Sequence, residues 1–198
     1  MFRYVTRTRQ QAGFSLFELM VVISVGFILA AMSIPRMSNV IAMMKLRSSM
    51  TTASSFFQNQ RMLAVKKNAT IKSDHTNRTT PPYSLVYWAK DYTDSSALNT
   101  HDPQVEMEAP IYAYDTPSGA GAPSAIPNGT LGLLSNPETT DPLFNSRGLP
   151  CKINGINCDN AAFIKYYQDT RSKRWAAVSI TPAGRIKRWF WSGSAWTD

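Results

Sequence analysis

The sequence is short of the residue types from which most enzyme sites are built. It has only two cysteines and two histidines in 198 residues, and neither His75 nor His101 lies at a metal-ligand spacing from the cysteines. It also lacks a Ser-His-Asp order, a His-Glu-x-x-His helix, a phosphate-cradling glycine loop and a glycosidase-like carboxylate pair. The sequence therefore argues against catalysis, and we expect neither a metal nor another cofactor.

A long apolar run lies close to the start of the chain. Basic residues at positions 3, 7 and 9 precede a nearly unbroken apolar stretch to Ile34, which contains one carboxylate, Glu18. About 20 apolar residues cross the ~30 Å of a bilayer core, so we expect a membrane helix with its basic flank in the cytoplasm. The alternative is a cleaved secretory signal, but its apolar core usually has only ~7–15 residues and ends in an Ala-x-Ala-like site.

The position of Glu18 indicates that the helix has a partner. An isolated carboxylate near the start of a membrane helix is expensive to bury and is usually retained for an interaction. The alternative is that Glu18 faces water at the membrane surface, but apolar residues flank it on both sides. We therefore predict that Glu18 pairs with a group on another molecule.

The segment Gly-Phe-Ser-Leu-Phe-Glu-Leu from Gly13 resembles the processing site of type IV prepilins and type II secretion pseudopilins. The resemblance implies that prepilin peptidase cuts after Gly13 and methylates Phe14. It further implies that Glu18, the fifth mature residue, is neutralised by the α-amino group of Phe14 on a neighbouring subunit, because a buried charge is tolerated only as part of a pair. Pro35, the twenty-second mature residue, is the helix-loosening proline of the family. The leader of 13 residues is longer than in many type IVa pilins.

The resemblance also implies a division of the chain and a location. Residues 1–13 are a cleaved leader, 14–35 a transmembrane and filament-core helix, 36–67 the amphipathic soluble half of that helix, and 68–198 a β-rich globular pilin domain. The implied partners are other pilins or pseudopilins through the N-terminal helix, prepilin peptidase and the inner-membrane assembly platform. The protein would cross the bacterial inner membrane once, with its N-terminus cytoplasmic and its domain periplasmic, before entering a pilus or pseudopilus.

Beyond the apolar run, the pattern predicts an amphipathic helix followed by strands. Helical spacing continues to about Lys66, and short β-prone runs separated by polar or Pro/Gly-rich turns follow. The predicted buried stripe of the helix is Val40, Met43, Leu46, Met50, Ala53, Phe57 and Ala64. The predicted strands are 70–72, 84–89, 105–114, 130–134, 161–168, 175–181 and 186–191, with loops at 93–103 and 116–129. We expect an α+β fold in which the second half of the helix packs against an antiparallel sheet or small sandwich, as in type IV pilins.

The two cysteines, Cys151 and Cys158, enclose a short segment with Gly155 near its centre. Two cysteines in a domain outside the cytoplasm most simply form a disulfide. A metal site would lack nearby histidine ligands, and a thiol enzyme would lack both Cys-x-x-Cys spacing and an adjacent histidine. We predict a Cys151–Cys158 disulfide that closes a tight turn.

The C-terminal segment combines positive charge with tryptophan. Its basic residues are Arg171, Lys173, Arg174, Arg185, Lys187 and Arg188, against the single acid Asp198. Such a mixture suits phosphate backbones and exposed bases or sugars. The alternative is a solvated edge strand protected by charge, with the aromatic side chains in the core. Both interpretations stay open.

Two C-terminal segments, 144–151 and 180–186, resemble the β-rich domain of minor pilins and pseudopilins of the GspH, FimU and FimT group. FimT-like pilins carry a Gly-Arg-x-Arg element tied to DNA binding, whereas this chain has Lys187 in place of the second arginine and Arg188 one position later. Three functions follow. The chain could be a minor type IV pilin that joins or primes a pilus, a DNA-binding minor pilin for DNA uptake in natural transformation, or a GspH-like minor pseudopilin of type II protein secretion.

Overall fold

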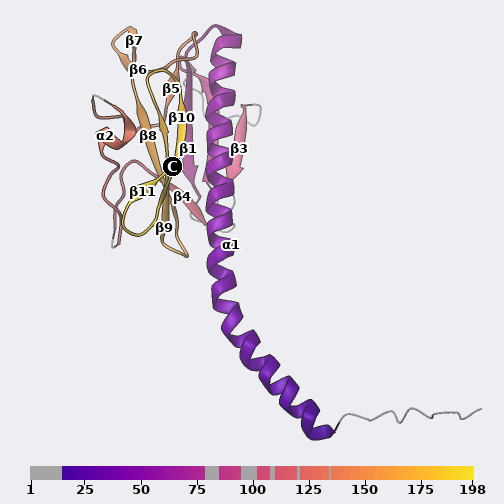
Figure 1. Cartoon of the computed structure of the whole chain (residues 1–198). Coiled ribbons are helices and arrows are strands. Elements are labelled where there is room, and N and C mark those ends of the chain that lie inside the picture. Colours follow the sequence, from indigo (N-terminus) through magenta and orange to yellow (C-terminus); the bar gives the residue numbers. More distant parts are fainter. Residues whose placement is uncertain (1–14, 79–84, 95–101, 108–109, 120, 134) are drawn as a thin grey trace, which may run out of the picture. The chain divides into compact units, whose positions relative to one another are not determined.

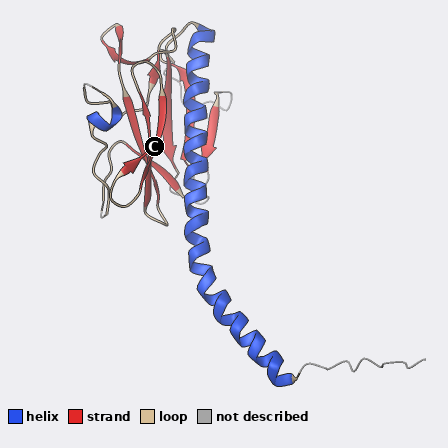
Figure 2. Ribbon diagram, in the orientation of Figure 1, coloured by secondary structure: helices blue, strands red, loops and turns tan. Residues whose placement is uncertain are grey.

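A computed structural model describes residues 15–78, 85–94, 102–107, 110–119, 121–133 and 135–198, without the side chains of residues 33–36. The chain divides between Val40 and Ile41 into two compact units. Helix α1 (Leu16–Lys67) begins in the first unit and ends in the second, close to the end predicted from its periodicity. Figures 1 and 2 show the helices and strands along the chain.

The second unit contains one short helix and eleven strands among its described residues. The helix is α2 (Asn128–Leu131). The strands are β1 (Ile71–Asn77), β2 (Leu85–Asp91), β3 (Gln104–Met107), β4 (Ile111–Tyr114), β5 (Leu143–Phe144), β6 (Pro150–Asn154), β7 (Asn157–Asn160), β8 (Phe163–Asp169), β9 (Arg174–Ile180), β10 (Ile186–Trp191) and β11 (Trp196–Thr197).

The strands form two sheets in which each pair of named neighbours is antiparallel. Sheet A has the order β3-β2-β1-β5-β6-β7, and sheet B has the order β11-β10-β9-β8-β4. In sheet B, Phe163 of β8 pairs with Ile180 of β9, and Ile186 of β10 pairs with the same Ile180. The α+β prediction is confirmed, with the β part built as two sheets. Figure 2 distinguishes the strands from the helices by colour.

The main core lies between the second half of α1 and side chains from both sheets. Leu46, Met50, Ala53, Phe57 and Ala64 of the predicted stripe are buried there, together with side chains of β1, β2, β8 and β9. The stripe was wrong at its start, since residues 40 and 43 are 52% and 36% exposed. Helical periodicity shows which residues share a face but not where along the helix packing begins, and here it begins at position 46.

A second core covers the opposite face of sheet B. Ile164 and Tyr166 of β8, Trp175 of β9 and Trp189 of β10 pack there against Ile126 and other residues of the segment before and within α2. Sheet B is therefore buried on both faces, which explains why β8 and β9 read as nearly continuous apolar and aromatic runs. The described residues of 116–129 form a loop as predicted, apart from the start of α2, and part of this loop closes the second core.

Two strand predictions need correction, and four short strands were not predicted. Residues 130–134 were predicted as a strand, but α2 ends at Leu131 and Gly132 follows it with φ 70°, a left-handed conformation that favours glycine and terminates helices. The single strand predicted at 105–114 was wrong, because its described residues belong to β3 and β4, which lie in different sheets. Alternation alone cannot show where a chain leaves one sheet for another. The sequence did not predict β5, β6, β7 or β11, which are short and polar or flanked by turns.

Candidate assembly segment and basic surface

The start of α1 is a capped helix terminus that carries Glu18. The Oγ of Ser15 accepts a hydrogen bond from the backbone N–H of Phe17 at 3.3 Å, and the carbonyl of Ser15 accepts one from Leu19 at 3.1 Å. Glu18 lies three residues after Ser15, the Ser-x-x-Glu spacing of a capping box. A carboxylate in the first turn also interacts favourably with the helix dipole. The hydrogen bond from Phe17 to Ser15 was not predicted from the sequence, although the Ser-x-x-Glu spacing was visible.

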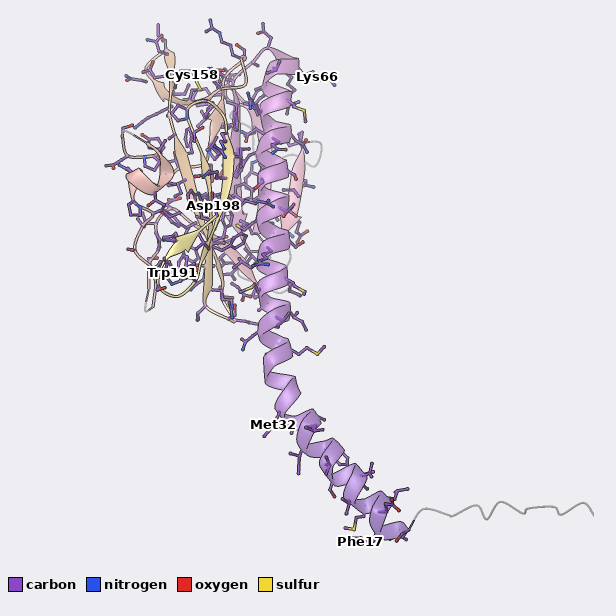
Figure 3. All side chains as sticks on the ribbon, viewed as in Figure 1. Phe17, Met32, Lys66, Cys158, Trp191 and Asp198 are labelled. Carbon is purple, nitrogen blue, oxygen red and sulfur yellow. A yellow bond between two sulfur atoms is a disulfide. The ribbon has the colours of Figure 1, made fainter. Side chains whose placement is uncertain are left out.

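The segment of α1 that follows is apolar and exposed around its whole circumference. Residues 15–32 are all exposed, with Phe17 at 73% and Phe27 at 75%, and Glu18 is their one ionisable side chain. Figure 3 labels Phe17 and Met32 near the ends of this segment. Its mean hydropathy reaches 2.3, and by length and composition it could cross a membrane. Such a surface requires lipid or apolar partners to remove it from water.

The remaining predicted processing residues are only partly described. Gly13 and Phe14 lie outside the described residues. Pro35 lies within the bounds of α1, but its side chain is outside the description. Proline lacks the backbone N–H that would bond to the preceding turn, so α1 has one intrahelical donor fewer at this position.

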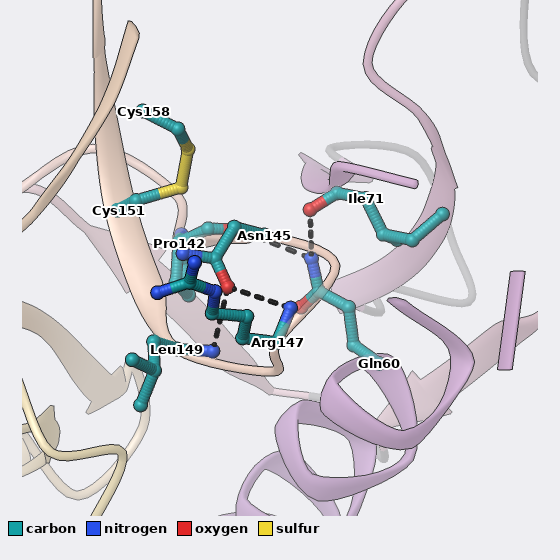
Figure 4. The surroundings of a disulfide bond; sticks show 8 residues. All are labelled: Gln60, Ile71, Pro142, Asn145, Arg147, Leu149, Cys151 and Cys158. Atoms are coloured by element: carbon teal, nitrogen blue, oxygen red, sulfur yellow. Dashed lines mark hydrogen bonds between the residues drawn. A yellow bond between two sulfur atoms is a disulfide. The ribbon is translucent and has the colours of Figure 1, made fainter. Parts of the chain in front are cut away.

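The predicted disulfide between Cys151 and Cys158 is present (Figure 4). It joins β6 to β7, whose hairpin turns through Gly155 at φ 64° and Ile156 at negative φ, the pattern of a type II′ turn. Figure 4 also shows Gln60 of α1, whose side-chain amide donates to the carbonyls of Ile71 and Pro142 at 3.2 and 3.1 Å. The turn between β6 and β7 requires glycine at its first central position, and Gly155 stands there, as the sequence predicted.

The six predicted basic residues fall into two groups at opposite ends of sheet B. Arg171, Lys173 and Arg174 lie at the β8–β9 turn, whereas residues 185, 187 and 188 lie at the start of β10, opposite the end of β9. Six residue steps along β9 at ~3.3 Å each separate the two ends by about 20 Å. The six residues therefore do not form one patch.

The second group is divided further by the pleat of β10. Lys187 lies on the face of Trp189, with its ammonium group 4.9 Å from that ring and 2.8 Å from a carboxylate oxygen of Asp198. This hydrogen bond and the charge of Lys187 lower the pKa of the Asp198 carboxyl. Arg188 lies on the other face and donates to Thr51 of α1 at 2.8 Å.

Arginines of α1 lie beside this second group, and the sequence analysis missed them. The guanidinium of Arg47 lies 5.7 Å from the ring centroid of Phe190, and Arg61 donates to the carbonyl of Gly184 at 3.3 Å, next to Arg185. Residues 47, 51 and 61 share one side of the helix, which periodicity could have shown. No pattern in the sequence could have shown that this side faces β10.

The aromatic residues of the C-terminal segment belong mainly to the core. Trp175 is 1% exposed and Trp189 is 3% exposed, and the indole of Trp189 donates to Ser179 at 2.8 Å. Trp196 is partly buried and donates to the carbonyl of Ser124 at 2.8 Å. For the two most buried tryptophans the core interpretation is correct.

A cluster of ionisable residues connects the two sheets. Nδ1 of His75 on β1 lies 2.6 Å from Oδ2 of Asp141, whose other oxygen is 3.0 Å from the ammonium of Lys165 on β8; Lys165 also contacts Asp115 at 2.6 Å. Asp74, His75 and Asp141 place potential ligand atoms within 4.8 Å of one another. Because the ammonium of Lys165 already neutralises Asp141, we read the cluster as a structural ion-pair network.

Two tyrosines lie in the main core between the sheets. The hydroxyls of Tyr87 and Tyr167 are 3.0 Å apart, and burial raises the pKa of both well above the ordinary tyrosine value. Each phenol therefore stays neutral and can donate or accept a hydrogen bond, so the pair is a second polar link between sheet A and sheet B.

A long N-terminal helix followed by antiparallel sheets is an α+β arrangement consistent with the type IV pilin-like class. Residues 8–34 match the model of the prokaryotic N-terminal methylation motif, which is characteristic of type IV prepilin-like proteins. This confirms the resemblance drawn from the N-terminal residues, and the motif is that of structural subunits rather than enzymes. The exposed apolar helix is consistent with a single-pass inner-membrane anchor. Comparisons with curated proteins and with solved structures gave no match.

Proposed function

We propose that this chain is a minor type IV pilin, a subunit that joins a pilus or primes its assembly. The observation that supports this most directly is the exposed apolar segment 15–32 with Glu18 in its first turn, inside the methylation motif at 8–34. The domain after the helix carries the features of a scaffold, a disulfide-closed hairpin and two packed cores.

In this proposal the N-terminal residues act in sequence. Prepilin peptidase cuts after Gly13, where the absence of a side chain leaves the backbone accessible, and the new N-terminal Phe14 is methylated. Until assembly the helix holds the protein in the inner membrane, with the globular domain in the periplasm. On leaving the lipid, the carboxylate of Glu18 pairs with the α-amino group of Phe14 on a neighbouring subunit, since an uncompensated charge in an apolar helix bundle is strongly unfavourable.

The proposal is tested on the native protein and three variants. Mass spectrometry of the mature N-terminus should find methylated Phe14. Gly13→Ala should block cleavage, and Glu18→Gln should be cleaved but absent from sheared pili. Glu106→Gln is the matched control, because it removes a half-exposed carboxylate on β3 and should assemble normally. A protein that keeps its first thirteen residues in its working location, or a Gly13→Ala variant that is processed and assembled normally, would contradict the proposal.

Two finer functions remain as further proposals. A GspH-like minor pseudopilin of type II secretion would use the same helix, and neighbouring genes separate it from a pilus subunit. DNA binding during natural transformation is favoured by one observation, the exposure of Arg188 near the exposed Arg47 of α1 and of Arg185 next to the glycine that Arg61 contacts. Binding of DNA by the purified full chain tests it.

A further inference from the structure

A groove lies between α1 and β3, the outermost strand of sheet A, and we call it the β3 groove. Its volume is about 530 Å³, and its lining is mostly apolar. Helix α1 contributes Phe56 and Leu63 to the lining. Sheet A contributes Ala89 of β2 and Val105 of β3, and Pro103 lies just before β3. Figure 1 shows β3 beside α1. The β3 groove therefore follows an open edge of a sheet.

The backbone of β3 carries hydrogen-bonding groups that point away from β2. Along an antiparallel pair, residues that bond to the partner strand alternate with residues whose N–H and C=O face the other way. The N–H of Ala89 donates to the carbonyl of Pro103 at 2.9 Å, so Val105, two residues further on, also bonds to β2. The backbone groups of Gln104 and Glu106 therefore face outward, and no strand of the described chain pairs with them.

The other edges of the two described sheets are protected differently. On β4, the side chain of Asn77 donates to the carbonyl of Ala113 and accepts from its N–H, both at 2.9 Å, and so occupies the groups that a further strand would use. Strand β11 has two residues, and β7 consists of polar residues and a disulfide-bonded cysteine, none of them buried. On β3, the charge of Glu106 and the nearby Pro103 discourage unselective pairing but leave the outward backbone groups accessible.

We propose that β3 accepts an extended segment of another polypeptide as a further antiparallel strand of sheet A. Strand addition takes its affinity from main-chain hydrogen bonds and its selectivity from sites for alternate side chains. Residues of the added strand opposite Gln104 and Glu106 exchange backbone hydrogen bonds with β3, because these two residues face outward. The residue opposite Val105 shares the face of the sheet on which Val105 lines the β3 groove.

The direction and composition of the added strand follow from the same geometry. Strand β2 is antiparallel to both β1 and β3, so an antiparallel addition continues the pattern of this part of sheet A. The side chains that face the groove occupy every second position of the added strand. The segment that fits is therefore apolar at these positions and polar at the positions between them, whose N–H groups bond to β3.

The binding test uses the full chain in a neutral detergent and a fluorescein-labelled peptide of about eight residues, in which threonine and valine alternate between terminal lysines. Fluorescence anisotropy gives the affinity. Methyl groups on the threonine nitrogens remove the N–H groups that face β3, whereas methyl groups on the valine nitrogens remove those that face away. Because at least two hydrogen bonds are lost, the first form should bind about tenfold or more weakly, and the second should bind within about threefold of the parent peptide.

Two pairs of variants locate the site on the protein. Glu106→Pro removes an outward N–H and leaves the bonds to β2, and Glu106→Thr is its control because it removes the same charge but keeps the N–H. Ser55→Phe fills the β3 groove from an exposed position on α1, and Gln58→Phe is its control because Gln58 is also exposed but lies outside the groove lining. Glu106→Pro and Ser55→Phe should each weaken binding about tenfold or more, and the controls should stay within about twofold. Thermal unfolding checks that all four variants are folded.

Four results would count against the proposal. The first is no binding of the parent peptide at concentrations up to about 1 mM. Equal binding of the two methylated peptides would show that the backbone of the peptide does not contact β3. A larger loss for the valine form would rule out the antiparallel direction. Normal binding by Glu106→Pro together with a loss in Ser55→Phe would mean that the β3 groove takes an apolar side chain without strand addition.

Discussion

Lys165 is the residue whose removal should destabilise the β-rich unit most clearly through charge. Its side chain is 3% exposed, and its ammonium contacts Asp115 at 2.6 Å and Asp141 at 3.0 Å. Asp141 is itself only 12% exposed, whereas Asp115 is 63% exposed. Replacing Lys165 with methionine keeps most of the side-chain volume but leaves a nearly buried carboxylate that has lost its cation.

The expected cost follows from the burial of Asp141. Breaking a buried ion pair on one side costs about 3–5 kcal/mol, because the remaining charge is uncompensated. His75 still contacts Asp141 at 2.6 Å, so we expect the lower end, about 3 kcal/mol. Loss of the contact with Asp115 adds little to this free energy, because water can solvate the exposed carboxylate. For a domain of roughly 150 residues or more, this free energy corresponds to a drop in Tm of about 6–12 °C.

The assay is thermal and urea unfolding of the full chain in detergent, followed by near-ultraviolet circular dichroism of its aromatic core. Lys67→Met is the matched control. It removes the partner of Asp91 from an ion pair whose side chains are 46% and 38% exposed, and such pairs contribute about 0–1 kcal/mol. A double variant, Lys165→Met with Asp141→Asn, removes the uncompensated charge and should regain most of the lost stability.

The reasoning would be refuted if Lys165→Met cost no more than the exposed control, or if the double variant were less stable than Lys165→Met alone. The first result would mean that water reaches Asp141 freely in the folded protein. The second would mean that the loss comes from packing around the lysine stem rather than from the stranded carboxylate.

Two further predictions concern the turn at Gly148, which contacts α1, and the disulfide-closed hairpin of β6 and β7. Gly148 has φ 73°, and an added Cβ would lie 2.9 Å from Val65, so Gly148→Ala should lower the free energy of unfolding by about 2 kcal/mol or more; Gly155→Ala, with a similar φ but open space around it, should lose about half as much. Cys158→Ser opens the short disulfide loop to Cys151 and should cost about 2 kcal/mol in unfolding experiments, and reducing the unmodified chain should reproduce that loss. Equal effects of the two alanine variants, or no effect of reduction, would contradict these predictions.

The N-terminal half of the protein was predictable because its information is local. The apolar run and the length of α1 were predicted from neighbouring residues, and the Ser15-to-Glu18 spacing, although not used, is local as well. The disulfide was predictable for the same reason, because Cys151 and Cys158 are close in sequence and Gly155 lies between them. Strands β8, β9 and β10 were predicted from the sequence because apolar residues occupy both faces, or most of the length, of each strand.

The β-rich unit was predicted less completely, since pairing between distant strands leaves little trace in any one segment. β5 has two residues and is held by β1 on one side and β6 on the other, a placement that neither its length nor its composition indicates. The tryptophans were ambiguous because an aromatic residue in a basic segment suits both a core and a nucleic-acid surface. Trp175 and Trp189 are buried because residues before and within α2 cover them, and the sequence predicted this segment as a loop to residue 129 and a strand after it.

The same limit explains why basic residues that are grouped in the sequence are separated in the structure. Charge close together in the sequence placed Arg171 and Arg185 in one group, whereas antiparallel pairing puts them at opposite ends of sheet B. Arg61 and Gly184 are 123 positions apart, and an added Cβ at Gly184 would lie 3.1 Å from the guanidinium carbon of Arg61. Gly184 has φ 81°, so glycine at this position meets both a backbone and a packing requirement. The glycine of the Gly-Arg segment therefore has a structural reason of its own, independent of any role of the arginines that follow it.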